Sequence, residues 1–128
     1  MIRLAEITRV FRMGDQEVRA LNRISLDIAS GEYVSIMGPS GSGKSTLLNV
    51  IGLLDRSDSG RYELDGADVT DLSGNERARV RREKIGFVFQ SFHLVPRLTA
   101  AENIELPLIL EGLAPAERTS RVDAALDA

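Results

Sequence analysis

A glycine-rich stretch in the first half of the chain constrains the fold most strongly. Residues 38–46 read GPSGSGKST, with three glycines within six residues. A short extended run at residues 32–37 precedes this stretch and predicts a strand. Residues 44–54 follow with apolar side chains spread widely around a helical wheel, which predicts a core helix covered on several sides. A strand that leads through such a loop into a helix indicates an α/β layered core.

The same stretch satisfies the pattern G-x-x-x-x-G-K-[ST], which predicts a phosphate-binding loop. A polyphosphate must be surrounded by inward-pointing backbone N–H groups, and Gly38, Gly41 and Gly43 give the backbone the freedom to do so. The helix expected near Lys44 would direct unpaired N–H groups and its positive dipole end at the same anion. Lys44 would add a charge for the β- and γ-phosphates, and the Ser45 hydroxyl could be one ligand of Mg²⁺.

Local patterns predict the other elements. Residues 2–28 alternate apolar and polar positions on either side of Gly14-Asp15, which predicts a half-buried antiparallel pair, and residues 61–66 end in Asp-Gly, a hairpin signal. Residues 76–84 predict a charged helix, and residues 85–89 an apolar strand.

The C-terminal part has helical spacing. Thr99 and Glu102 fit a capping box, so a helix should begin near Ala100. Pro115 suits the first turn of a second helix, on which Thr119, Val122 and Leu126 would share a face. That helix reaches the last residue without a glycine or asparagine cap, so we expect the sequence to be cut inside an element.

Composition narrows the class of protein. The chain has 128 residues, 43% hydrophobic and 27% charged, with no cysteine, which is typical of one globular domain or part of one and excludes disulfide and thiolate chemistry. With 16 Lys+Arg against 19 Asp+Glu, no nucleic-acid partner is expected, and anion binding must come from a local site. No apolar run is long enough to cross a bilayer, and the chain is expected to be cytoplasmic.

Three strings give the chain a resemblance to the nucleotide-binding subunits of ABC transporters: LNRISLDIASGE at residues 21–32, GPSGSGKST at residues 38–46, and IGFVFQ at residues 85–90. The resemblance implies an α/β fold: a P-loop NTPase core with an antiparallel β flap and the start of a helical subdomain, truncated to the N-terminal portion. Residues 1–31 would form the β flap, residues 32–90 the P-loop core through the Q-loop, and residues 91–128 the start of the helical subdomain.

The resemblance also assigns roles to residues. Phe11 occupies the position of an aromatic that stacks on adenine, although the family more often has tyrosine there; a flap-core phenylalanine is the other interpretation. Gln90 matches the Q-loop glutamine, whose amide oxygen can serve Mg²⁺ or an attacking water, and Lys44 and Gln90 are the catalytic candidates. Ser45 and Gln90 are the expected metal ligands. The expected ATP-binding residues are Phe11, Gly38, Ser40, Gly41, Ser42, Gly43, Lys44, Ser45 and Thr46.

Residues 98–103 (LTAAEN) and 106–108 (LPL) make the chain similar to the branch that serves lipoprotein release and macrolide or peptide export. This similarity implies ATP and Mg²⁺ as cofactors and a homodimer of nucleotide-binding subunits. The family resemblance also implies transmembrane permease partners, which would hold the chain at the inner face of the cell membrane. Residues 91–98 are the expected partner contact, with an ordinary loop as the other interpretation.

The Walker B carboxylates, the LSGGQ signature and the switch histidine of the family do not occur in these residues. We therefore expect the full-length parent to hydrolyse ATP and this chain alone to bind ATP while hardly hydrolysing it. We also expect it to expose an unpaired apolar sheet edge. Two alternatives stay open: a P-loop kinase of small metabolites, and a catalytically silent binding module.

Overall fold

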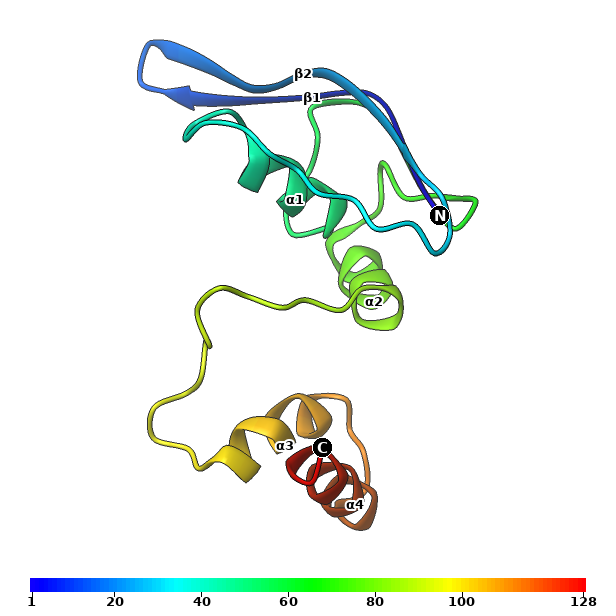
Figure 1. The fold of residues 1–128 in the computed structure, drawn as a ribbon, viewed down its shortest axis with the longest axis vertical. Helices are drawn as coiled ribbons and strands as arrows, with labels where there is room; N and C mark the ends of the chain where they lie inside the picture. The colour runs from blue at the N-terminus through cyan, green and yellow to red at the C-terminus, as the bar shows by residue number, and fades with distance from the viewer. The chain divides into compact units, whose positions relative to one another are not determined.

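The computed structural model describes residues 1–128, which form two compact units, Met1–Phe87 and Val88–Ala128. The first unit contains all of the strands and two helices, and the second contains two further helices (Figure 1).

A four-stranded antiparallel sheet forms the frame of the first unit. Its strands are β1 (Ile2–Met13), β2 (Gln16–Ile28), β3 (Ser59–Leu64) and β4 (Ala67–Asp68), in the order β2-β1-β3-β4. Both predicted hairpins are confirmed, because Met13 pairs with Gln16 around Gly14-Asp15 and Leu64 pairs with Ala67 around the Asp-Gly turn. The two residues of that second turn have φ values of 51° and 81°, which Asp-Gly tolerates better than most pairs.

The two helices of the first unit are α1 (Lys44–Ile51) and α2 (Gly74–Lys84). One face of the sheet packs with α1 and the residues that follow it, as Figure 1 shows. The buried core consists of Leu4, Ile7, Leu21, Val50, Leu53, Tyr62, Leu64 and Val69. The expectation that the first helix is covered on several sides is wrong, since Leu48 and Leu54 are 55% and 44% exposed. The core therefore lies between one face of α1 and one face of the sheet.

Two predicted strands are not part of the sheet. Neither residues 32–37 nor residues 85–89 enter a hydrogen-bonded ladder, so the prediction of strands there is wrong for this chain. A strand needs a neighbour that accepts and donates its backbone hydrogen bonds, and no segment of the chain takes that place. Side chains of both runs are consequently open to solvent: Tyr33 is 96% exposed and Val88 is fully exposed.

The second unit contains α3 (Ala100–Leu110) and α4 (Pro115–Leu126). The predicted capping box is confirmed: Thr99 Oγ1 accepts the Glu102 N–H at 3.2 Å, and the Glu102 carboxylate accepts the Thr99 N–H at 2.7 Å. Pro115 lies in the first turn of α4, as predicted. Val122 is buried, whereas Leu126 is 51% exposed, so only part of the predicted α4 face is covered. None of the helices has the length and hydropathy needed to cross a membrane.

Candidate functional site

The glycine-rich loop leaves the end of the 32–37 run and closes a tight turn before α1. The Ser42 N–H donates to the Pro39 carbonyl at 3.3 Å, and Gly41 within this turn has a φ of +79°. Gly43 has a φ of +90° and caps the N-terminus of α1. Both conformations are left-handed, where a side chain would strain the backbone. The positions of these glycines in the motif therefore follow from the path of the backbone.

The backbone of Gly43 also lies very close to the hairpin, which is a second reason why this position requires glycine. A Cβ at this position would lie 2.3 Å from the carbonyl oxygen of Ala20 in β2. The register of the hairpin passes from Arg9↔Leu21 to Val10↔Arg19, so Ala20 is an extra residue, as in a β-bulge. The bulge brings a backbone carbonyl against the end of the loop, and only glycine fits between them.

The N-terminus of α1 presents unpaired donors. No side chain caps it, and the first intrahelical bond runs from the Leu47 N–H to the Gly43 carbonyl at 2.8 Å. The N–H groups of Lys44, Ser45 and Thr46 therefore have no acceptor inside the helix. Together with the positive end of the helix dipole, they favour an anion at this end.

Lys44 folds back over the loop. Its Nζ donates to the carbonyl oxygens of Gly38 at 2.9 Å and Pro39 at 2.6 Å, and lies 3.5 Å from Ser42 Oγ. The ammonium is thus held beside the loop by neutral acceptors rather than by a carboxylate. Phosphate oxygens are stronger partners for an ammonium than backbone carbonyls are. An arriving phosphate can therefore take over these hydrogen bonds.

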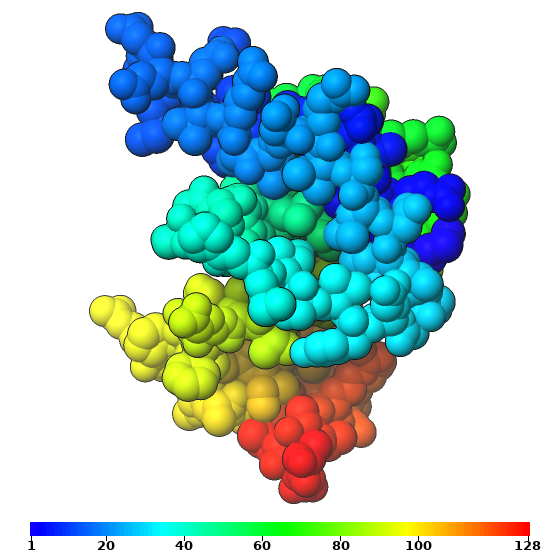
Figure 2. Space-filling view, turned by 45° about the horizontal axis from the view of Figure 1, so that its top comes forward, coloured from blue at the N-terminus to red at the C-terminus, as the bar shows by residue number.

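A cavity of about 300 Å³ lies between the hairpin and the loop. Figure 2 shows the hairpin, in blue, standing over the cyan loop and helix. The cavity joins Phe11 to the phosphate loop, although the two are far apart in the sequence. It is lined by Phe11, Val18, Arg19, Ala20, Ser40, Gly41, Gly43, Lys44, Ser45 and Thr46.

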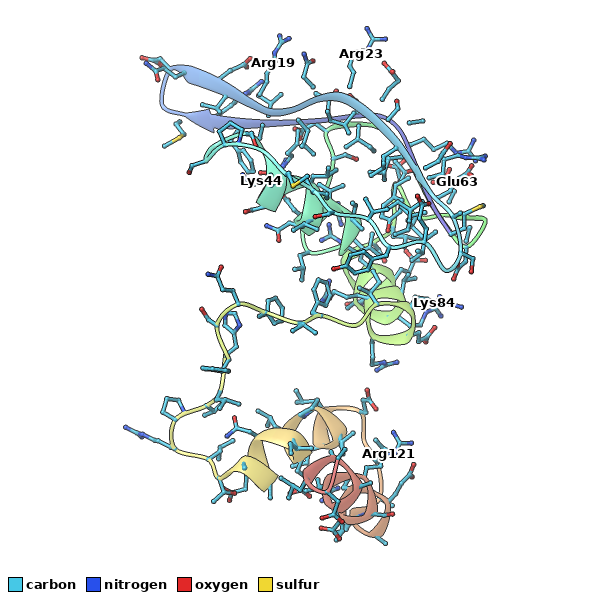
Figure 3. All side chains as sticks on the ribbon, in the orientation of Figure 1. Arg19, Arg23, Lys44, Glu63, Lys84 and Arg121 are labelled. Carbon is cyan, nitrogen blue, oxygen red and sulfur yellow. The ribbon has the colours of Figure 1, made fainter.

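Sequence reasoning did not identify the β2 side of this cavity. Phe11 pairs with Val18 in the register of the hairpin, so the two side chains lie on one face, next to Ala20. Arg19 is also among the residues that line the cavity, but it pairs with Val10, and in Figure 3 its side chain points away from Lys44. The signal that could have located Val18 was the two-residue turn at Gly14-Asp15, which sets the register of the whole hairpin.

Gln90 belongs to the second unit, whereas Phe11 and the loop belong to the first, so the role of Gln90 stays a prediction. Beside it, the rings of Phe89 and His93 meet edge to face with centroids 4.7 Å apart. Among the Asp, Glu and His side chains, no group of three comes together that could hold a metal ion. The described site thus consists of the loop, the start of α1 and Phe11.

The GxxxxGK[ST] motif at residues 38–45, followed directly by the start of α1, is typical of a P-loop domain. A sequence profile described as "ABC transporter" matches residues 21–128, so the chain belongs to the ABC transporter family. It is 51% identical over 127 residues to the uncharacterized ABC transporter ATP-binding protein YknY of Bacillus subtilis, covering 99% of this chain and 55% of YknY. It is 52% identical over 126 residues to the macrolide export ATP-binding/permease protein MacB of Marinobacter nauticus, covering 98% of this chain and 20% of that protein.

Solved structures agree with this assignment. The structure matches the dimeric ATP-binding cassette MJ0796 of Methanocaldococcus jannaschii, solved in a post-hydrolysis state bound to ADP and Pi, with a TM-score of 0.87 and 47% identity. The match covers 99% of this chain and 56% of the cassette. The chain therefore spans about half the length of these single-cassette relatives and corresponds to their N-terminal portion, as the resemblance implied.

Proposed function

We propose that this chain is the ATP-binding part of an ABC transporter subunit. The observation that carries the proposal is that Phe11 and the phosphate loop line the same cavity. An aromatic ring suits a base, and unpaired N–H groups with one ammonium suit a triphosphate. The cavity therefore offers groups that are complementary to both the base and the triphosphate of one nucleotide.

Each loop residue has a role in this proposal. Gly38, Gly41 and Gly43 let the backbone curve around the phosphates, and the N–H groups at the start of α1 donate to them. Lys44 exchanges its carbonyl partners for β- and γ-phosphate oxygens and so stabilises charge there. The remaining proposed phosphate contacts come from hydroxyl-bearing residues, namely Ser40, Ser42, Ser45 and Thr46.

The donor chemistry of the expected Mg²⁺ ligands fits that ion. Ser45 offers a hydroxyl at the exposed start of α1, and Gln90 offers an amide oxygen. Mg²⁺ prefers such hard oxygen ligands together with phosphate oxygens and water. When bound, the ion would neutralise phosphate charge, and Ser45 would hold it next to the nucleotide. The role of Gln90 as metal ligand and catalytic residue is part of the proposal.

We further propose that this chain alone binds ATP and hardly hydrolyses it. The cavity is lined by no carboxylate and no imidazole that could act as a general base. In the whole protein, ATP binding and hydrolysis would drive export or lipid and lipoprotein extraction by transmembrane permease partners. MacB relatives are named as macrolide export ATP-binding/permease proteins, which supports a permease partner, and the MJ0796 cassette is dimeric, which supports a homodimer. The position of that homodimer at the inner face of the cell membrane is part of the proposal.

The number of phosphates provides the test. Calorimetric titration of the full chain with ATP, ADP and AMP, each with Mg²⁺, should show ATP and ADP binding at least tenfold tighter than AMP. The reason is that AMP lacks the phosphates that the loop and Lys44 would hold. Phosphate release by the wild type should stay at the level of Lys44→Ala. Equal affinity for AMP and ATP would contradict the phosphate-loop role, and release well above the Lys44→Ala level would contradict the binding-only role.

A further inference from the structure

Arg9 of β1 has an unusual set of partners that the sequence did not reveal. Its guanidinium forms a bidentate pair with Asp55, with Nε–Oδ2 and Nη2–Oδ1 distances of 3.0 Å each. Nη1 donates to Asp58 Oδ1 at 2.9 Å. The guanidinium carbon also lies 4.8 Å from the centroid of the Phe11 ring. One side chain therefore touches the candidate adenine-stacking ring and the segment that follows α1.

The acceptors of Arg9 are themselves fixed. Asp58 Oδ2 accepts the Val10 N–H at 2.6 Å, and the Asp58 N–H donates to the Thr8 carbonyl at 2.8 Å. These bonds tie the backbone of β1, on both sides of Arg9, to the segment after α1. The side chains of Arg9 and Asp55 are only 21% and 28% exposed, so solvent screens this pair less than a surface pair. The guanidinium plane is consequently held in one orientation.

An aromatic ring has two faces, and a cation occupies only one of them. The guanidinium lies over one face of the Phe11 ring and attracts it by a cation–π interaction. Because the guanidinium is itself held in place, this attraction restricts the rotation of the ring. Phe11 as a whole is 37% exposed and lines the cavity together with the loop, so part of the residue stays open there. A base that stacks on the open face would meet a ring that is already oriented, which lowers the ordering cost of binding.

We propose that Arg9 is a positioning residue for base recognition: it orients Phe11 for stacking on the purine ring. This inference rests on the proposed nucleotide-binding function and deepens it. Arg9 acts through the ring and not on the phosphates, because its hydrogen bonds go to Asp55 and Asp58. Its effect should therefore be confined to the part of the binding energy that depends on the base.

A purely structural role makes a different prediction. If the Arg9 pairs only held the sheet to the segment after α1, their loss would loosen the loop as well as the ring. Affinity for a bare triphosphate chain would then fall together with affinity for ATP. Comparing ATP with inorganic tripolyphosphate, each with Mg²⁺, separates the two roles.

The experiment is a double-mutant cycle on the full chain, with Arg9→Met, Phe11→Ala and the double variant, followed by calorimetry. Phe11→Ala should weaken ATP about fivefold to 100-fold, which is the range for loss of one base–aromatic stack. Arg9→Met should weaken ATP roughly threefold to tenfold and leave tripolyphosphate affinity unchanged. In the Phe11→Ala background, Arg9→Met should have no further effect on ATP. Arg23→Met is the matched control, because Arg23 pairs with Glu6 elsewhere in the same hairpin, and both affinities should be retained.

Several results would overturn the inference. Equal losses for ATP and tripolyphosphate, or effects of Arg9→Met and Phe11→Ala that simply add, would show that Arg9 does not act through the ring. If Arg9→Met fails to fold, Arg9→Lys keeps the charge but lacks the planar fork, and it should show the same ATP-specific loss; an unchanged ATP affinity would refute the inference. A wild type that binds neither ligand would refute the proposed function itself.

Discussion

Replacing Gly43 by alanine tests how the hairpin and the phosphate loop are fitted together. Two separate penalties arise at this position. A non-glycine residue at a φ of +90° is strained by about 1–2 kcal/mol. The new Cβ would also lie 2.3 Å from the Ala20 carbonyl oxygen, and relief of such an overlap by backbone shifts costs about 1–3 kcal/mol. Alanine also lowers the conformational entropy of the unfolded chain, which stabilises the fold by about 0.4–1 kcal/mol and offsets part of these two penalties.

Gly41→Ala is the matched control, because Gly41 has a similar φ of +79° but a Cβ added there would meet no atom within 4 Å. The two variants share the strain and the unfolded-state effect, so the difference between them isolates the overlap with Ala20. We expect Gly43→Ala to lower the free energy of unfolding by about 1–3 kcal/mol more than Gly41→Ala does. Urea denaturation followed by far-ultraviolet circular dichroism measures both variants. Equal destabilisation would refute the claim that the loop is pressed against β2.

Two further predictions concern other parts of the chain. Thr99→Ala removes the capping hydroxyl of α3 and should lower the free energy of unfolding of the second unit by about 0.5–2 kcal/mol. Thr119→Ala, at an exposed position of α4, should change that free energy by less than about 0.5 kcal/mol, and denaturation curves of the two variants that coincide would contradict this. Burial, and to a smaller extent the Asp65 carboxylate, raises the pKa of Tyr62 to about 12. Because the pKa of Tyr62 is higher in the folded than in the unfolded chain, its neutral phenol contributes fully to stability below about pH 10. As the pH rises from about 10 to about 12, the free energy of unfolding should fall by about 3 kcal/mol in all. Denaturation at a series of pH values should show this loss in the wild type but not in Tyr62→Phe; parallel profiles of the two proteins would contradict it.

Elements that depend on local chemistry could be predicted from the sequence. The two short hairpin turns, the capping box at Thr99 and the helix beginning at Lys44 each follow from a few neighbouring residues. The turn geometry required glycines at Gly41 and Gly43, and these are where the motif has them. Local turn, cap and loop preferences operate within a few residues, so a single sequence contains them.

Features that depend on distant partners could not be predicted. Residues 32–37 and 85–89 have strand-like composition, but a ladder requires a neighbouring strand, and the sequence pattern does not say which segment provides one. The contacts of Arg9 with Asp55 and Asp58 join residues 46 and 49 positions apart, and neither periodicity nor motif spacing marks such a pair. Val18 likewise reaches the cavity only through the register of the hairpin.

The central claim is that the loop and Lys44 hold the triphosphate of a nucleotide. Titration calorimetry with ATP in the presence of Mg²⁺, on the wild type and on Lys44→Ala side by side, tests it most directly. We expect saturable binding to the wild type and at least a tenfold loss of affinity in Lys44→Ala, whose fold should be retained because the Lys44 ammonium is bonded only within its own loop. No heat of binding in the wild type, or equal affinity in the two proteins, would show that the loop and Lys44 do not hold the triphosphate.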